Sequence, residues 1–311
     1  MTERGLPVVA VIGPTASGKS ALAVHLAQVL DGEIVNADSM QLYRGMDIGT
    51  AKLAPAERGG VAHHLLDVWP LAKSAAVAEY QSMARGVIAE VHGRGRLPIL
   101  VGGSGLYLRG ALDVLEFPGE SPPIRARLYA ELDAHGPQVL HARLAAVDPL
   151  AATAILPSNG RRIVRALEVI ELTGRPFTAR MPAFESIYDC VQVGLDRDDL
   201  DERVELRVHL MMAVGFLDEV RQLLPPGLRA SPTAGKALGY SQLLACVDDD
   251  GALVGDLDEA VAQTIRATRR FVRRQRSWFR RDPRVRWLDA ADPNCQDLAL
   301  AQVRAALPAA C

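Results

Sequence analysis

The sequence predicts an α/β fold in which a P-loop parallel sheet is flanked by helices and carries a helical insertion domain. Three observations support this prediction. Short apolar strands alternate with helices over the first hundred residues, as in strand–helix–strand crossover units. A glycine-rich segment with phosphate-loop spacing follows the first strand. A wholly helical stretch then interrupts the alternation before strand-like sequence returns.

The first hundred residues contain three candidate strands and two candidate helices. Val8–Ile12, Ile34–Ala37 and Leu97–Val101 are short apolar runs typical of buried strands. A helix is predicted from Lys19 to about Leu30, and apolar residues recur at spacings of three and four over 77–91. Because each helix joins two strands, we expect a parallel sheet whose functional residues lie at the carboxyl ends of the strands.

The helical insertion follows the third strand. Ser121-Pro122 provides a helix start, and further helical segments are predicted around Val139–Val147 and Gly160–Leu172. No strand is predicted within it. The sequence therefore predicts two domains, a P-loop core made of residues 1–118 and 184–311 and a helical insertion over 119–183.

The C-terminal half is predicted to complete the core domain. Strand-like runs at Cys190–Leu195 and Val285–Leu288 extend the sheet, and long amphipathic helices are expected near Leu200–Leu224 and Asp258–Arg281. The second of these helices is rich in arginine. Binding of RNA phosphates is one interpretation of that cluster, and a solvated face with some structural arginines is the other.

Composition excludes several classes of protein. The 311 residues are 49% hydrophobic with a formal net charge of −2, which fits a globular chain and gives no sign of a nucleic-acid partner by itself. Four scattered cysteines argue against a disulfide framework and a zinc site. No apolar run of membrane-spanning length occurs, so we expect a cytoplasmic protein without a membrane partner.

Residues 13–20 match the pattern G-x-x-x-x-G-K-[ST] between a predicted strand and a predicted helix. The glycines allow backbone N–H groups to converge on phosphate oxygens, and the helix N-terminus adds a favourable dipole. Lys19 supplies a positive charge for the terminal phosphate, and the Ser20 hydroxyl can ligate Mg²⁺. The motif does not identify the phosphate compound. The predicted phosphate-binding residues are Gly13, Pro14, Thr15, Ala16, Ser17, Gly18, Lys19 and Ser20.

Two further strand ends carry candidate catalytic residues. Asp38, after the second strand, can accept a proton from a nucleophile or position Mg²⁺, or it can serve as a turn or helix-cap residue. The third strand runs into Gly102–Gly105 without the metal-binding acid that many P-loop NTPases carry there. Ser104 in this turn can hydrogen-bond a substrate or only shape the turn. Arg109 can place a guanidinium near the phosphates or be a solvated helix residue.

Further motifs follow the P-loop along the chain. They are Asp38–Lys52, His63–Asp67, Gly102–Tyr107, Arg162–Glu168, Leu238–Tyr240, Ala267–Phe271 and Arg274–Phe279. Together with the P-loop they span nearly the whole chain, and in this order the sequence closely resembles the tRNA dimethylallyltransferases, also called tRNA isopentenyltransferases. Ser20 and Ser104 stand where many relatives have threonine, and Ser241 where some have arginine. The absence of a C-terminal zinc finger favours the bacterial type.

The resemblance implies transfer of a dimethylallyl group from dimethylallyl diphosphate to N6 of adenine 37 in tRNA, giving N6-dimethylallyladenosine and diphosphate. The P-loop would hold the diphosphate with the help of Mg²⁺ and Arg109, and Asp38 would accept the amine proton, with Ser104 beside the adenine. We expect a monomer that grips the anticodon stem-loop. The implied tRNA contacts are Asp38, Ser39, Met40, Gln41, Ser104, Arg125, Arg161, Arg162, Ile163, Val164, Arg165, Lys236, Gly239 and Tyr240.

Three rival functions stay open on the residues alone. A small-molecule kinase would use a P-loop and an acid after the second strand for phosphoryl transfer. A prenyltransferase acting on free AMP or ADP would share the donor, although the basic helix and the helical insertion favour tRNA. An RNA-binding module with a relic P-loop would catalyse nothing, and the intact Lys19, Ser20 and Asp38 argue against it.

Overall fold

The computed structural model describes residues 6–177 and 183–307. The chain divides into two compact units. The core unit comprises Met1–Asp113 and Ser186–Cys311, and the helical unit comprises Val114–Glu185. The helical unit is therefore longer at both ends than the predicted insertion over 119–183. In the described ranges, no helix has both the length and the apolar character needed to cross a membrane.

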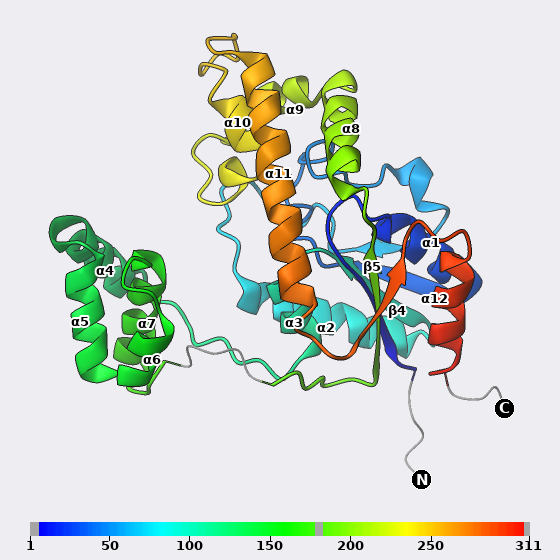
Figure 1. Cartoon of the computed structure of the whole chain (residues 1–311), viewed down its shortest axis with the longest axis horizontal. Helices are drawn as coiled ribbons and strands as arrows, with labels where there is room; N and C mark the ends of the chain where they lie inside the picture. The colour runs from blue at the N-terminus through cyan, green and yellow to red at the C-terminus, as the bar shows by residue number, and fades with distance from the viewer. Residues whose placement is uncertain (1–5, 178–182, 308–311) are drawn as a thin grey trace. The chain divides into compact units, whose positions relative to one another are not determined.

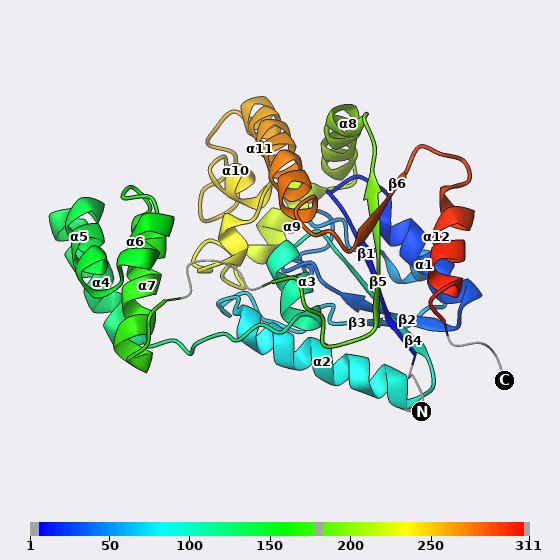
Figure 2. The ribbon, with the colours of Figure 1, turned by 60° about the horizontal axis from the view of Figure 1, so that its bottom comes forward.

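The core unit is built on a six-stranded sheet with the order β3-β2-β4-β1-β5-β6, in which every paired neighbour is parallel. This confirms the predicted fold class. The two-residue β3 was not predicted, because adjacent histidines give no apolar run. Figure 2 shows the strands from a side that separates them. The strands are β1 Val8–Ile12, β2 Gly32–Asn36, β3 His63–His64, β4 Leu97–Gly102, β5 Cys190–Asp196 and β6 Val285–Asp289.

Helices cover both faces of this sheet, so its central strands are apolar throughout. On β1, Val8, Ala10 and Ile12 pack into one hydrophobic cluster, while Val9 and Val11 pack into the cluster on the opposite face. Helices α1 and α12 lie on the second face, and α2 and α3 on the first (Figures 1 and 2). These helices are α1 Lys19–Val29, α2 Val77–Gly93, α3 Gly105–Leu112 and α12 Cys295–Arg304.

The single long helix predicted over Leu200–Leu224 is wrong, because the structure has two helices there. They are α8 Leu200–Ala213 and α9 Phe216–Leu223. Gly215 separates them with a φ of 102°, a left-handed conformation that ends a helix and that glycine adopts without strain. The amphipathic pattern continues across the break, so periodicity alone could not reveal it. The chain continues through the short α10 Tyr240–Leu244 into α11 Leu257–Phe279.

Over its described residues, the helical unit contains four helices around its own apolar core (Figure 1). Leu128, Leu140, Leu144, Ile163 and Leu167 are among its buried residues. Prolines occupy the first turn of three of these helices, where the missing backbone N–H costs nothing. The helices are α4 Pro122–His135, α5 Pro137–Val147, α6 Pro149–Ala154 and α7 Gly160–Thr173.

Candidate active site

The phosphate loop connects β1 to the first turn of α1. Gly18 is the N-cap of α1 with a φ of 96°, a conformation that lets the loop turn sharply into the helix. Ser17 is buried, and its hydroxyl has no hydrogen-bond partner among the described residues. A buried unpaired hydroxyl costs free energy, so a phosphate oxygen in this loop would satisfy it. The geometry therefore fits the predicted phosphate site.

Lys19 lies inside the loop, where its ammonium donates a 2.5 Å hydrogen bond to the Pro14 carbonyl. Burial and repulsion from Arg207 together lower the pKa of Lys19 to about 7, although attraction to Asp38 opposes both effects. An anion bound in the loop would restore the charged form of the lysine.

Asp38 follows the carboxyl end of β2 and serves as a turn residue, whereas its role as a proton acceptor stays a prediction. Its Oδ1 accepts a 2.9 Å hydrogen bond from the Met40 N–H, and its own N–H donates 2.9 Å to the Asn36 side chain, so it shapes the turn. Desolvation raises the pKa of Asp38, while the hydrogen bond from Met40 and the charge of Lys19 lower it. The carboxylate thus lies within electrostatic reach of the phosphate loop.

The turn after β4 meets the loop after β2 through Ser104. The Ser39 N–H donates to Ser104 Oγ at 3.4 Å, and the two serine hydroxyls lie 3.4 Å apart. Gln41, farther along the same loop, donates to the Thr50 carbonyl at 3.1 Å. The structure therefore brings together the predicted residues Asp38, Ser39 and Ser104 at one edge of the sheet.

Two arginines of α8 also contact the phosphate loop, and sequence reasoning missed both. Arg207 Nη1 donates to Thr15 Oγ1 at 3.1 Å, and Arg203 Nε donates to the Ala16 carbonyl at 2.9 Å. Desolvation lowers the pKa of Arg207, as does repulsion from Arg203, whereas Asp38 raises it. The spacing of four residues, which places both arginines on one helix face, was the available signal.

Arg109 is buried on α3 and forms an ion pair with Asp113, one helical turn later. Arg284 contacts the same carboxylate at 2.7 Å. Asp113 therefore compensates the positive charge of Arg109, which was predicted to bind the diphosphate. The role of Arg109 in diphosphate binding stays a prediction.

In the helical unit, the predicted RNA contacts fall into two groups. Arg125 and Arg165 both contact the buried carboxylate of Glu168 at 2.9 Å. Ile163 and Val164 are buried in the apolar core, at 0% and 1% exposure. Their side chains are thus unavailable to RNA, and a contact of these two residues with RNA through the backbone stays a prediction. The motif spans both faces of α7, and only one face is exposed.

The remaining predicted RNA contacts also divide into exposed residues and buried residues. Arg161 and Arg162 are exposed at the start of α7, and Lys236 is exposed beside α10. Gly239 is buried, and the buried Tyr240 donates its hydroxyl to Glu219 at 2.6 Å. The Tyr240 side chain therefore has a structural role, and the predicted contact of Gly239 and Tyr240 with RNA stays a prediction.

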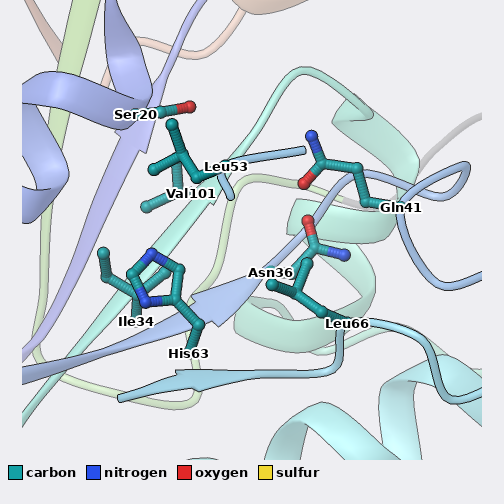
Figure 3. Close-up of a pocket in the computed structure, with 8 residues that line it drawn as sticks. All are labelled: Ser20, Ile34, Asn36, Gln41, Leu53, His63, Leu66 and Val101. Atoms are coloured by element: carbon teal, nitrogen blue, oxygen red, sulfur yellow. The ribbon is translucent and has the colours of Figure 1, made fainter. Parts of the chain in front are cut away.

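A small cavity of about 30 Å³ lies beside Ser20, between β2, β3 and β4 (Figure 3). His63 forms part of its wall, and His63 Nδ1 lies 2.9 Å from the Val61 carbonyl. Across the described ranges, no cluster of three or more His, Cys, Asp or Glu residues could hold a metal ion. The eight lining residues are Ser20, Ile34, Asn36, Gln41, Leu53, His63, Leu66 and Val101.

Comparison with known proteins gives consistent results. A family model described as IPP transferase matches residues 41–282. The tRNA dimethylallyltransferase of Streptomyces coelicolor is 65% identical over 285 residues, covering 90% of this chain and 89% of that protein. That of Acidothermus cellulolyticus is 64% identical, with 92% and 89% covered.

Solved structures agree with the sequence comparison. The tRNA isopentenylpyrophosphate transferase of Bacillus halodurans superposes with a TM-score of 0.68 at 38% identity, covering 96% of this chain and 97% of that one. A eukaryotic dimethylallyltransferase acting on tRNA superposes with a TM-score of 0.79 at 25% identity, covering 96% and 77%.

Proposed function

This chain belongs to the IPP transferase family, in its bacterial form, and we propose that it transfers a dimethylallyl group from dimethylallyl diphosphate to N6 of adenine 37 in tRNA. The products are N6-dimethylallyladenosine and diphosphate. One observation carries the proposal: the loop that carries Asp38 meets the turn that carries Ser104, at the edge of the sheet where β1 runs into the phosphate loop. A proton acceptor for the amine and a binding loop for the leaving diphosphate are thus part of one site.

The phosphate loop stabilises the leaving group. As the allylic C1–oxygen bond breaks, negative charge develops on the diphosphate, and preorganised donors at that position lower the barrier. Lys19, Arg207 and the buried hydroxyl of Ser17 supply donors in addition to the backbone N–H groups of the loop. Arg109 is a further proposed donor if its pairing with Asp113 adjusts on binding. No nucleophilic residue is needed, because the adenine amine attacks C1 directly.

Asp38 accepts the proton that N6 loses as the new carbon–nitrogen bond forms. The adenine amine is a weak nucleophile because its lone pair is delocalised into the ring, and a positioned base contributes about 10²–10⁴-fold. Desolvation raises the pKa of Asp38, which makes its carboxylate a stronger base than a solvated one. The adenine must first leave its stack in the anticodon loop. Ser39, Met40, Gln41 and Ser104 line its proposed position.

Mg²⁺ is the proposed cofactor, with the Ser20 hydroxyl as its protein ligand. The residues fit this assignment, since Mg²⁺ commonly binds through few protein oxygens together with substrate phosphates and water. When bound, it supplies positive charge to the diphosphate. Ser20 begins α1 beside Lys19, so its hydroxyl lies at the same loop as the proposed phosphates.

The tRNA-binding surface is proposed to include the helical unit and α11. Arg161 and Arg162 are exposed at the N-terminus of α7, where helix dipole and side-chain charge both favour phosphate. Arg125, Arg165 and the segment around Lys236 and Gly239 complete the proposed contacts. We also propose that the protein is a monomer. We propose that it works in the cytoplasm, since free thiols at Cys190, Cys246 and Cys295 fit a reducing compartment.

The proposal is tested by mass spectrometry of tRNA nucleosides after incubation with the enzyme, Mg²⁺ and dimethylallyl diphosphate. We expect N6-dimethylallyladenosine with the wild-type chain and a loss of about 10²-fold or more with Asp38→Asn, which keeps the size of the side chain but cannot accept the proton. Parallel reactions contain AMP or ATP. Prenylation of AMP in preference to tRNA, or hydrolysis of ATP without any prenyl transfer, would overturn the proposal.

A further inference from the structure

One buried side chain of α11 joins two of the loops at the candidate site. Gln275 Nε2 donates to the Gly103 carbonyl at 2.9 Å, and Gln275 Oε1 accepts from the Thr15 N–H at 3.0 Å. Thr15 belongs to the phosphate loop, and Gly103 to the turn that carries Ser104. Gln275 is only 5% exposed, although arginines surround it in the sequence of the helix. A polar side chain is therefore buried here between the buried Gly103 and the half-buried Thr15.

The turn after β4 is shaped to receive α11 on both sides of Ser104. A Cβ atom on Gly103 would lie 2.3 Å from Gln275 Nε2, and one on Gly105 would lie 2.0 Å from Trp278 Nε1. Gln275 and Trp278 are three positions apart, so they lie on one face of the helix. A side chain at either glycine would clash with Gln275 or Trp278, so Ser104 lies between two close contacts with α11.

Thr15 is held from a second direction as well. Its hydroxyl accepts from Arg207 on α8, while its N–H donates to Gln275 on α11. Helices α8 and α11 pack together beside the phosphate loop, where Ala16, Val204 and Val272 share a small apolar cluster. The position of the loop therefore depends on both helices, and Gln275 is the residue that also reaches the Ser104 turn.

The chemistry of the two partners selects an amide at position 275. The Thr15 N–H needs an acceptor and the Gly103 carbonyl needs a donor, and a glutamine side chain offers one of each. A methionine of similar length offers neither, and a carboxylate offers only the acceptor. Either change leaves a buried backbone group without its partner, which is unfavourable.

We propose that Gln275 is a positioning residue that fixes the separation between the diphosphate loop and the Ser104 turn. This inference rests on the proposed function, in which the loop holds the prenyl donor and the turn lies beside the adenine. Gln275 touches neither substrate, but it sets how closely the amine approaches the allylic carbon. Its loss should consequently slow the chemical step more than it weakens the binding of either substrate.

The test compares Gln275→Met with the control Gln28→Met in steady-state transfer assays. Gln28 is exposed on α1 and donates to the Gly59 carbonyl at 2.9 Å, and a Cβ on Gly59 would lie 2.4 Å from its Nε2, so the control removes a similar contact far from the site. For Gln275→Met we expect kcat to fall about 10- to 100-fold, with both KM values within about threefold of wild type. Gln28→Met should keep the wild-type kcat.

Gln275→Glu provides a second variant in case the methionine disturbs folding. It retains the acceptor for the Thr15 N–H and lacks the donor for Gly103, so its kcat should fall between those of wild type and Gln275→Met. Thermal unfolding of all the variants identifies any loss of folded protein. Wild-type kcat in both Gln275 variants, or a loss confined to the KM values, would overturn the inference. A wild-type chain without any transfer to tRNA would instead overturn the proposed function.

Discussion

Cationic side chains are held in different ways in the two units of this chain. In the core unit, Lys19 and Arg207 lie at the phosphate loop, and desolvation lowers the pKa of each. In the helical unit, Arg125 and Arg165 both contact the buried carboxylate of Glu168. The first pair has only partial compensation from Asp38, whereas the second pair shares an acid that is 0% exposed.

The difference indicates which cations the fold itself compensates and which depend on a ligand for full compensation. Burying a cation costs free energy unless an anion compensates it. In the helical unit the fold supplies that anion, so the arginines stabilise the packing of α7 against the segment before α4. At the phosphate loop the fold leaves part of the compensation to a ligand, and a site of that kind is suited to a diphosphate.

Replacing Lys19 should have the largest effect. Lys19→Met removes the charge inside the loop, so we expect diphosphate binding to be lost and kcat/KM for the donor to fall by about 10³-fold or more. Calorimetric titration with inorganic diphosphate measures the binding. Lys73→Met is the control, because Lys73 pairs with Glu79 away from the loop, and it should bind as the wild type does. Unchanged diphosphate affinity in Lys19→Met would show that the loop does not hold the donor.

Replacing Arg207 should have the next largest effect, since its guanidinium contacts the loop from α8. With Arg207→Gln we expect kcat/KM for dimethylallyl diphosphate to fall about 10²-fold, because one donor to the leaving group is lost. The affinity for tRNA, measured by filter binding, should stay within about twofold. Loss of tRNA affinity with unchanged donor affinity would show that Arg207 serves tRNA binding rather than diphosphate binding.

The features that sequence predicted well are local ones. The P-loop motif, its strand and its helix lie within one short segment, and the central strands β1 and β4 are apolar throughout. The break at Gly215 was missed, because the amphipathic pattern continues through it. The burial of the Ile163 and Val164 side chains was not predicted, because the motif that contains them does not say which face of its helix is buried.

The contacts that complete the site could not be read from the sequence. Arg207 reaches Thr15 across 192 positions, and Gln275 reaches it across 260. Each residue lies on a helix with an amphipathic sequence. That pattern predicts packing of the helix, but it does not predict a contact with the phosphate loop. Only the packing of α8 and α11 beside the loop brings these side chains to it.

Within the helical unit, the comparison predicts that protein stability and RNA binding depend on different residues. Glu168→Gln leaves Arg125 and Arg165 without a buried carboxylate, so the free energy of unfolding of the chain should fall by about 1–3 kcal/mol. Arg161→Gln, at the exposed start of α7, should leave that free energy unchanged and raise the KM for tRNA several-fold. Urea unfolding and steady-state assays measure the two effects. Equal loss of stability in both variants would contradict the separation.

The smallest expected effect is an uptake of protons when the donor binds. The pKa of Lys19 is lowered to about 7, so at pH 8 the lysine is mostly neutral before an anion arrives. A bound diphosphate favours the ammonium form and raises that pKa, and binding should therefore take up a fraction of a proton at pH 8 and almost none at pH 6. Affinity should accordingly weaken as the pH rises above 7. Titration calorimetry in two buffers of different ionisation enthalpy measures the uptake, with Lys19→Arg as the control because its guanidinium stays charged throughout this range. Equal proton uptake in the Lys19→Arg variant would assign the proton to another group. Lys19 would then not be a cation whose charge depends on the bound diphosphate.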